Sequence, residues 1–144
     1  MAIYSLSNRT TNVTIANPCI EIYSAATVKA RIMEIGIFMA AATASVFGIG
    51  RAAAIGVTPT TPVTMLAEEV NDPAGLVYTA IAWATPPTVP VNFFRRVSLA
   101  AAIGTGVIFT FPKGLTITPS TGSIVVWNIT GNTGVSDIHF VVEV

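Results

Sequence analysis

Alternation between apolar and polar residues constrains the fold of this chain more than any other feature of its sequence. In the segment 137–144 every second residue is apolar, while Asp137, His139 and Glu143 lie between those positions. This period of two is typical of a β-strand with one buried face. The segment is therefore predicted to be a strand that directs its polar side chains outward.

The same pattern recurs along the chain. In 31–39, Met33, Ile35, Ile37 and Met39 are predicted to share one face, opposite Glu34. Further strands are predicted at 17–24, 63–68, 77–83, 95–99, 107–111 and 123–129. Val, Ile and Thr dominate, whereas Leu, Lys and Glu are scarce, which favours strands over helices.

Turn sequences rich in Pro, Gly, Asn and Asp separate these segments at short intervals, as in 58–62, 71–75 and 118–122. About eight to ten short strands with such spacing predict an all-β fold with little helix. We expect all 144 residues to form one domain, a jelly-roll-like antiparallel β-sandwich.

The composition indicates a surface with few charges. Only 10% of the residues are charged, 52% are hydrophobic, and the formal net charge is zero. A folded monomer of this mass exposes roughly 7,000 Å², so its charges are spread thinly. Such a surface has little protection against association. We expect part of it to be buried against other subunits.

Several classes of function are disfavoured by the same composition. Seven cations with no cluster larger than Arg95 and Arg96 are poorly suited to nucleic acid. The single cysteine, Cys19, follows Pro18 in an apolar stretch and is predicted to be a small buried residue. The uncharged segment 35–50 is shorter than a membrane helix and is predicted to be two strands joined near 41–43. No secretory signal is visible at the N-terminus.

Candidate catalytic groups are few, and we predict no enzyme activity, metal site or cofactor. The only histidine, His139, shares a predicted strand face with Asp137 and Glu143, but no Gly-x-Ser-x-Gly turn accompanies it. The segment 48–53 matches a dinucleotide-binding pattern, yet no helix follows it, so we interpret it as a strand end with Arg51 exposed.

Two segments are candidates for contacts with other proteins. The segment 83–94 contains three prolines and apolar residues, which predicts either a stiff projecting loop or a connection folded over the core. The arginines that follow it resemble interface hot spots, with one predicted to be exposed and the other to lie against the sheet or a neighbouring subunit. The stretch 1–14 is either an extended arm or an ordinary edge strand. The predicted interface residues are Ile3, Tyr4, Leu6, Trp83, Val89, Val91, Phe93, Phe94, Arg95 and Arg96.

Four segments of the chain combine strand and turn patterns. They are 31–36 (RIMEIG), 93–99 (FFRRVSL), 106–115 (GVIFTFPKGL) and 122–128 (GSIVVWN). These segments resemble the small jelly-roll proteins that decorate the heads of tailed bacteriophages. The resemblance extends over most of the chain from about residue 17. It implies a homotrimer that binds the major capsid protein, bridges its subunits and stabilises the outer surface of the head. It further implies synthesis in the cytoplasm of the bacterial host. From the charge and from the length of the segment 35–50 we expect neither nucleic acid nor a membrane as a partner.

A second reading is a carbohydrate- or receptor-binding jelly roll of a virion fibre or tail. Sugar sites present aromatic platforms near amides and carboxylates, and this chain has two tryptophans, Trp83 and Trp127. Because Trp127 falls within a predicted strand, it is expected to pack in the core. The decoration function is therefore preferred.

Overall fold

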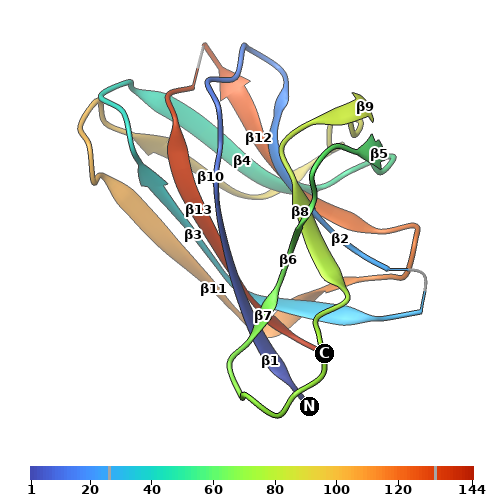
Figure 1. Cartoon of the computed structure of the whole chain (residues 1–144). Coiled ribbons are helices and arrows are strands. Elements are labelled where there is room, and N and C mark those ends of the chain that lie inside the picture. The colour runs from blue at the N-terminus through green and yellow to red at the C-terminus, as the bar shows by residue number, and fades with distance from the viewer. Residues whose placement is uncertain (26, 132) are drawn as a thin grey trace.

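The computed structural model describes residues 1–25, 27–131 and 133–144, and within them it consists of strands, turns and loops without helix. Eight strands build a sandwich of two sheets (Figure 1). They are β1 (Ile3–Arg9), β2 (Pro18–Ser24), β3 (Ala30–Met39), β4 (Ser45–Arg51), β10 (Phe93–Leu99), β11 (Gly106–Ile117), β12 (Ser123–Thr130) and β13 (Ser136–Glu143). The predicted all-β sandwich is confirmed.

The strand pairing has the nested order of a jelly roll. The first strand pairs with the last, β1 with β13, and the following pairs are β2 with β12, β3 with β11 and β4 with β10, all antiparallel. Contacts of β13 with β3 and of β12 with β4 complete the two four-stranded halves. A long hairpin wrapped around two sheets produces this order.

Five short strands lie in an insertion, residues 52–92, between β4 and β10. They are β5 (Val57–Pro59), β6 (Val63–Thr64), β7 (Leu66–Ala67), β8 (Val77–Ala80) and β9 (Trp83–Thr85). β7 extends one sheet beside β1, β8 and β6 extend the other beside β2, and β5 and β9 form a separate ribbon. The insertion therefore covers one open edge of each sheet, whereas β11 and β10 remain at the opposite edges.

The core follows the alternation predicted from the sequence. On β13, Ile138, Phe140 and Val142 are buried, and the residues between them face outward. On β3 the expected face is partly wrong, because Ile32 rather than Met33 joins Ile35 and Ile37 in the core. The pairing register of β13 with β3 shifts at this point, and such an irregularity reverses the alternation of a strand.

The outer face of the β2–β12–β4 sheet is also covered. Val125 and Trp127 of β12 are buried along with the inward residues of the same strand. Pro90 of the insertion packs so closely on Gly50 that a Cβ there would lie 2.6 Å from the proline Cβ. The glycines of 48–53 thus permit close packing within β4, and Arg51 is exposed as expected.

The segment 35–50 forms parts of two strands, as predicted, with β3 and β4 joined by residues 40–44. Within the described residues, no helix has the length and apolar character needed to cross a membrane. The stretch 1–14 contains β1, which is hydrogen-bonded between β13 and β7, so it is neither an arm nor an open edge strand.

Candidate docking surface

The predicted interface residues of β1 divide between the core and the surface. Tyr4 and Leu6 are 3% and 6% exposed and belong to the hydrophobic core. Their assignment to an interface was wrong, because β1 is a strand of the sandwich and directs every second side chain inward. Ile3 lies on the other face of the strand and is exposed.

The segment 83–94 folds back over its own domain, which is the second of the two predicted arrangements. Its first residues form β9, which pairs with β5, and Pro87 and Pro90 are buried. Val89 and Val91 nevertheless remain exposed on its surface. Trp83 is half-buried, since its indole nitrogen donates a hydrogen bond to Glu21.

The aromatic–arginine pair begins β10 at the open edge of its sheet. A register irregularity between β10 and β4 falls at Phe94, which is 40% exposed, whereas Phe93 packs over Gly48. The guanidinium of Arg95 lies 5.4 Å from the ring centroid of Phe111 on β11 and so spans the open side of the sandwich. Arg96 is exposed.

The most distinctive surface lies at the end of the sandwich opposite the two termini (Figure 1). Four connections meet there, residues 10–17, 40–44, 100–105 and 133–135, which we call the loop end. None of these segments contains a charged residue. Ile15 and Ile103 are 58% and 73% exposed within them, among small residues dominated by Ala and Thr.

Backbone hydrogen bonds join the four connections into one surface. The N–H of Thr133 donates to the carbonyl of Val13 (2.8 Å), and that of Ala40 donates to Val135 (2.9 Å). The N–H of Met39 donates to the carbonyl of Thr105 (2.8 Å). Each connection is thus fixed to its neighbour, which lowers the conformational entropy that docking would otherwise remove.

A buried side chain fixes the loop end from below. Asn128 of β12 is 0% exposed, and its amide nitrogen donates to the carbonyl oxygens of Val13 (3.1 Å), Thr14 (2.7 Å) and Gly131 (2.8 Å). The bonds to Thr14 and Gly131 occupy backbone acceptors of the irregular loops, and the bond to Val13 adds to the one that its carbonyl accepts from the N–H of Thr133. The amide therefore determines the shape of the segment 10–17.

The centre of the loop end contains a pit of about 290 Å³, lined by Asn12, Val13, Thr14, Thr43 and Thr133. Its side chains offer hydroxyl, amide and methyl groups. At its border, Arg9 donates two hydrogen bonds of 2.7 and 2.8 Å to Asp137. This contact holds the pKa of Asp137 below its ordinary value. An uncharged centre beside a charged border is the usual anatomy of a protein interface.

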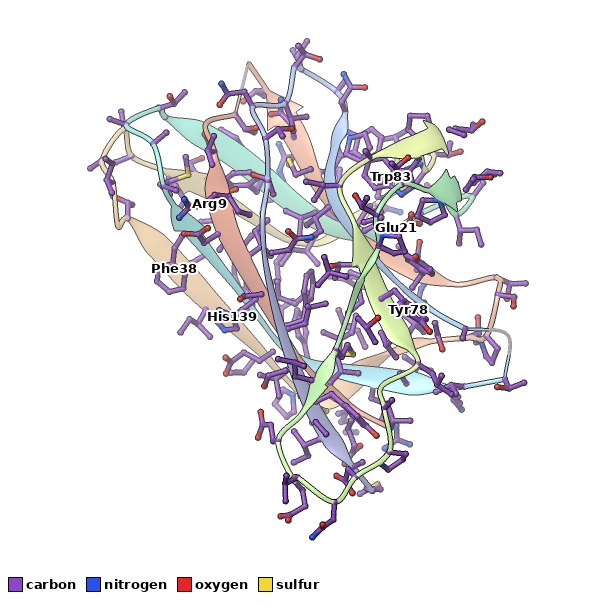
Figure 2. The ribbon with its side chains drawn as sticks, viewed as in Figure 1. Arg9, Glu21, Phe38, Tyr78, Trp83 and His139 are labelled. Atoms are coloured by element: carbon purple, nitrogen blue, oxygen red, sulfur yellow. The ribbon has the colours of Figure 1, made fainter. Side chains whose placement is uncertain are left out.

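His139 lies outside the loop end, on the outer face of β13. Its Nε2 is 2.9 Å from Glu34 Oε1, and its ring stacks on Phe38 at a centroid distance of 6.2 Å (Figure 2). Asp137 and Glu143, the carboxylates on its own strand, pair instead with Arg9 and Arg31. The expected shared face is present, but the carboxylate beside the imidazole belongs to β3.

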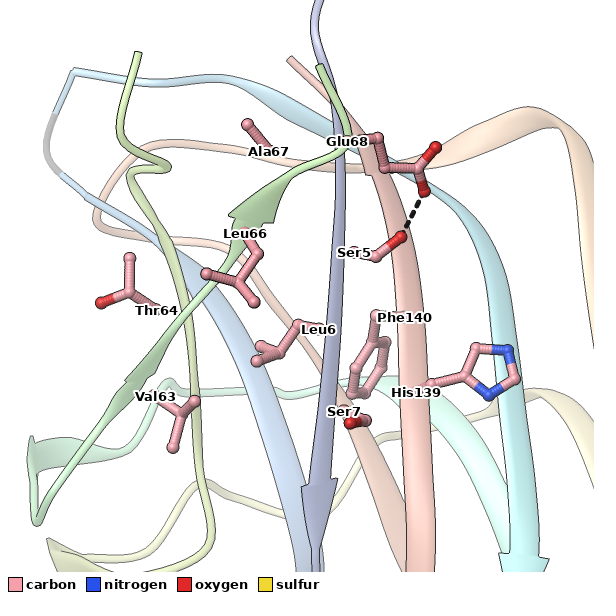
Figure 3. Close-up of a pocket in the computed structure, with 10 residues that line it drawn as sticks. All are labelled: Ser5, Leu6, Ser7, Val63, Thr64, Leu66, Ala67, Glu68, His139 and Phe140. Atoms are coloured by element: carbon pink, nitrogen blue, oxygen red, sulfur yellow. Dashed lines mark hydrogen bonds between the residues drawn. The ribbon is translucent and has the colours of Figure 1, made fainter. Parts of the chain in front are cut away.

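A hollow of about 550 Å³ lies between β1 and the β6–β7 segment (Figure 3). Ser5 donates a hydrogen bond to Glu68 at its rim, and Leu6 and Phe140 form part of its lining. Ser7 is opposite His139 in the strand register. The imidazole, however, is directed away from Leu66 and Val63 and toward β3 (Figures 2 and 3). Among the described residues, His139 forms no hydrogen bond with a hydroxyl group.

Glu21 is a buried carboxylate on the outer face of β2 (Figure 2). It accepts hydrogen bonds from the N–H of Gly56 (3.0 Å) and from Trp83 Nε1 (2.8 Å), both in the insertion. Burial raises the pKa of Glu21, and these hydrogen bonds partly oppose that increase. Glu21 therefore attaches the β5–β9 ribbon to the sandwich.

The described side chains include no cluster suited to a metal ion and one buried thiol. Among residues 1–25, 27–131 and 133–144, no three His, Cys, Asp or Glu side chains gather in a way that could hold a metal ion. The thiol of Cys19 is buried as predicted, which raises its pKa to about 12.

Sequence reasoning missed the loop end as a candidate surface. The only available signal was the absence of charge from segments that are far apart in the sequence. That signal acquires meaning only after the nested pairing brings the four connections to one end. Comparison of the chain with protein-family models, curated proteins and solved structures found no match.

Proposed function

We propose that this protein is a capsid decoration protein, which binds the outer surface of a phage head and stabilises contacts between major capsid protein subunits. It acts as a homotrimer on the virion exterior after synthesis in the host cytoplasm. The sequence resemblance to phage decoration proteins supplies this hypothesis. The jelly-roll topology and the low charge of the surface are consistent with it.

The loop end carries the proposal. Docking removes water from both partners, and removing water from a charged group is costly unless that group finds a good partner. Four adjoining connections without a charged side chain avoid this cost. Ile15 and Ile103 add exposed apolar area that gains from burial. We propose that this end faces the shell.

The low charge of the whole surface supports an assembly function in the same way. The chain exposes 6962 Å² and carries 14 charged side chains, seven of each sign. Within the described residues, the ion pairs of Arg9 with Asp137 and of Arg31 with Glu143 further reduce the field of these charges. A surface of this kind is suited to burial in a larger assembly.

Co-sedimentation with phage heads tests the proposal. The heads come from the phage that encodes this chain and lack the protein. We expect saturable binding of the wild-type protein and at least about tenfold weaker binding of Ile103→Glu, because docking would bury an unpaired carboxylate. Val91→Glu is the matched control, since Val91 is 86% exposed but lies in the insertion.

With this control, the position of the contact surface and the decoration function are tested separately. Loss of binding by Val91→Glu, with normal binding by Ile103→Glu, would move the contact to the segment 83–94 that the sequence favoured. No binding of the folded wild-type protein to heads would reject the decoration function. A glycan that binds the protein when heads do not would then favour the receptor-binding reading. The structure gives that reading less support, because Trp127 is buried and the indole N–H of Trp83 is engaged by Glu21.

A further inference from the structure

Among the described residues, seven charged side chains outside ion pairs are segregated between opposite edges of the sandwich, whereas Lys29, beside the chain termini, and the buried Glu21 belong to neither edge. At the open edge, Arg51, Arg95, Arg96 and Lys113 belong to β4, β10 and β11, and the segment 93–117 contains no acidic residue. At the edge covered by the insertion, Glu68, Glu69 and Asp72 are the charged residues of the segment 52–92. Within the described part of the chain, none of these seven residues forms an ion pair.

The open edge has a shape as well as a charge. Pairing of β11 with β3 is interrupted between Thr110 and Leu115, and this bulge forms the wall of a hollow of about 360 Å³. Phe111, Pro112 and Leu115 contribute apolar surface to the hollow, and Arg95 and Lys113 contribute cations. We call this surface the basic hollow. Because a bulge with Pro and Lys disfavours the addition of a strand, its ligand must bind mainly through side chains.

The opposite edge presents a matching protrusion. Residues 66–72, which we call the acidic strap, run from β7 into the loop that precedes β8. Leu66 and Val70 are 75% and 90% exposed there, next to the three carboxylates. The N–H of Asp72 donates to the carbonyl of Glu69 (3.0 Å), which forms a turn around Val70.

We propose that the acidic strap of one copy of this chain docks in the basic hollow of the next copy. Val70 supplies an apolar side chain for the Phe111–Leu115 hollow, and Glu69 and Asp72 face Arg95 and Lys113. Opposite charge and an apolar centre on both surfaces identify the partner as a second copy. This inference specifies the contacts of the oligomer named in the proposed function and, to that extent, rests on it.

The proposed interface is heterologous, since the two surfaces lie on opposite edges of one molecule. β11 and β7 are the two outermost strands of the same sheet, with β3, β13 and β1 between them. Because the two surfaces lie on opposite edges, a twofold contact would pair one edge with the same edge of the second copy and so place like charges together. Head-to-tail contact places each strap against a hollow, and it closes into a ring when the rotation between copies permits.

A charge-swap experiment tests the interface. The double variant Arg95→Glu/Lys113→Glu reverses the charge of the basic hollow. The double variant Glu69→Lys/Asp72→Lys reverses the charge of the acidic strap. A quadruple variant combines all four substitutions. Sedimentation velocity gives the oligomeric state, and circular dichroism with thermal unfolding verifies the fold. We expect each double variant to associate at least about tenfold more weakly than wild type, because like charges would then meet at the interface. The quadruple variant should regain the wild-type oligomer, because opposite charges would meet again.

The outcomes separate this inference from the proposed function. Three results would each overturn the head-to-tail interface: a monomeric wild-type protein, a strap double variant that forms the wild-type oligomer, or a folded quadruple variant that stays monomeric. If both double variants kept the oligomer and only the hollow double variant lost binding to heads, the basic hollow would instead face the capsid. Loss of head binding by Ile103→Glu with an intact oligomer concerns docking only and leaves the interface between copies supported.

Discussion

Glu21 provides the most direct test of how the insertion is held on the sandwich. Its carboxylate is 1% exposed and accepts the N–H of Gly56 and the indole N–H of Trp83. Glu21→Ala would leave both donors without this partner. A buried donor left unsatisfied costs about 1–3 kcal/mol. Because Gly56 and Trp83 are only partly buried, water can replace part of the loss. We expect Glu21→Ala to lower the free energy of unfolding by about 2–3 kcal/mol.

We expect the substitution to lower both the global free energy of unfolding and the local stability of the β5–β9 ribbon. Urea unfolding at pH 7 measures the free energy, and native-state hydrogen exchange of the Gly56 amide reports the ribbon itself. Glu21→Gln retains one acceptor oxygen and is expected to remain within about 1 kcal/mol of wild type. If Glu21→Ala were as stable as wild type and the Gly56 amide kept its protection, the carboxylate would not be what attaches the ribbon.

The same residue predicts a dependence on pH with a definite sign. Burial raises the pKa of Glu21 above its ordinary value of 4.5 in the unfolded chain. The folded protein therefore holds this proton more tightly, and the resulting stabilisation is fully present below pH 4.5. It is lost as the pH rises through the folded pKa. Glu21→Gln should remove this slope from the curve of stability against pH, whereas Glu69→Gln, at an exposed site, should retain it.

Two further predictions concern buried polar groups. Asn128→Asp replaces the donor to the carbonyls of Val13, Thr14 and Gly131 with an acceptor, so we expect urea unfolding to show a loss of at least about 3 kcal/mol. Wild-type stability in this variant would mean that the loop end is not fixed by the amide. The thiol of Cys19, with its pKa raised to about 12, should resist alkylation at pH 8 in the native protein and react after unfolding in urea. Rapid labelling of the folded protein would show that the thiol is accessible.

Alternation in the sequence identified strands because each buried face requires apolar side chains at a spacing of two. It predicted the outward residues of β13 and a strand at 17–24, which corresponds to β2. It did not reveal that the outer face of β2 is covered, since the covering residues come from the insertion. It also misplaced Met33, because a local shift of register leaves no mark on the pattern of residue types.

The candidate surfaces were harder to predict because they depend on which loops become neighbours. The polar residues around Tyr4 and Leu6 favoured an arm as strongly as a strand, and only pairing with β13 decides between them. The loop end combines segments that are up to 125 residues apart, from residue 10 to residue 135. No local property of any one segment indicates that the others are also uncharged.

The insertion makes the two edges of the subunit differ in charge, because it protects the sheets on one side only. A jelly roll has two open edges on each side, and exposed edges invite uncontrolled pairing. Here β7 and β8 cover the edges beside β1 and β2, and the segment that connects them carries Glu68, Glu69 and Asp72, none of which forms an ion pair within the described residues. The edges at β10 and β11 are protected instead by a bulge, Pro112 and cations. Protecting the two sides by different means therefore produces surfaces of opposite charge, and a subunit with such surfaces favours head-to-tail contact over twofold contact.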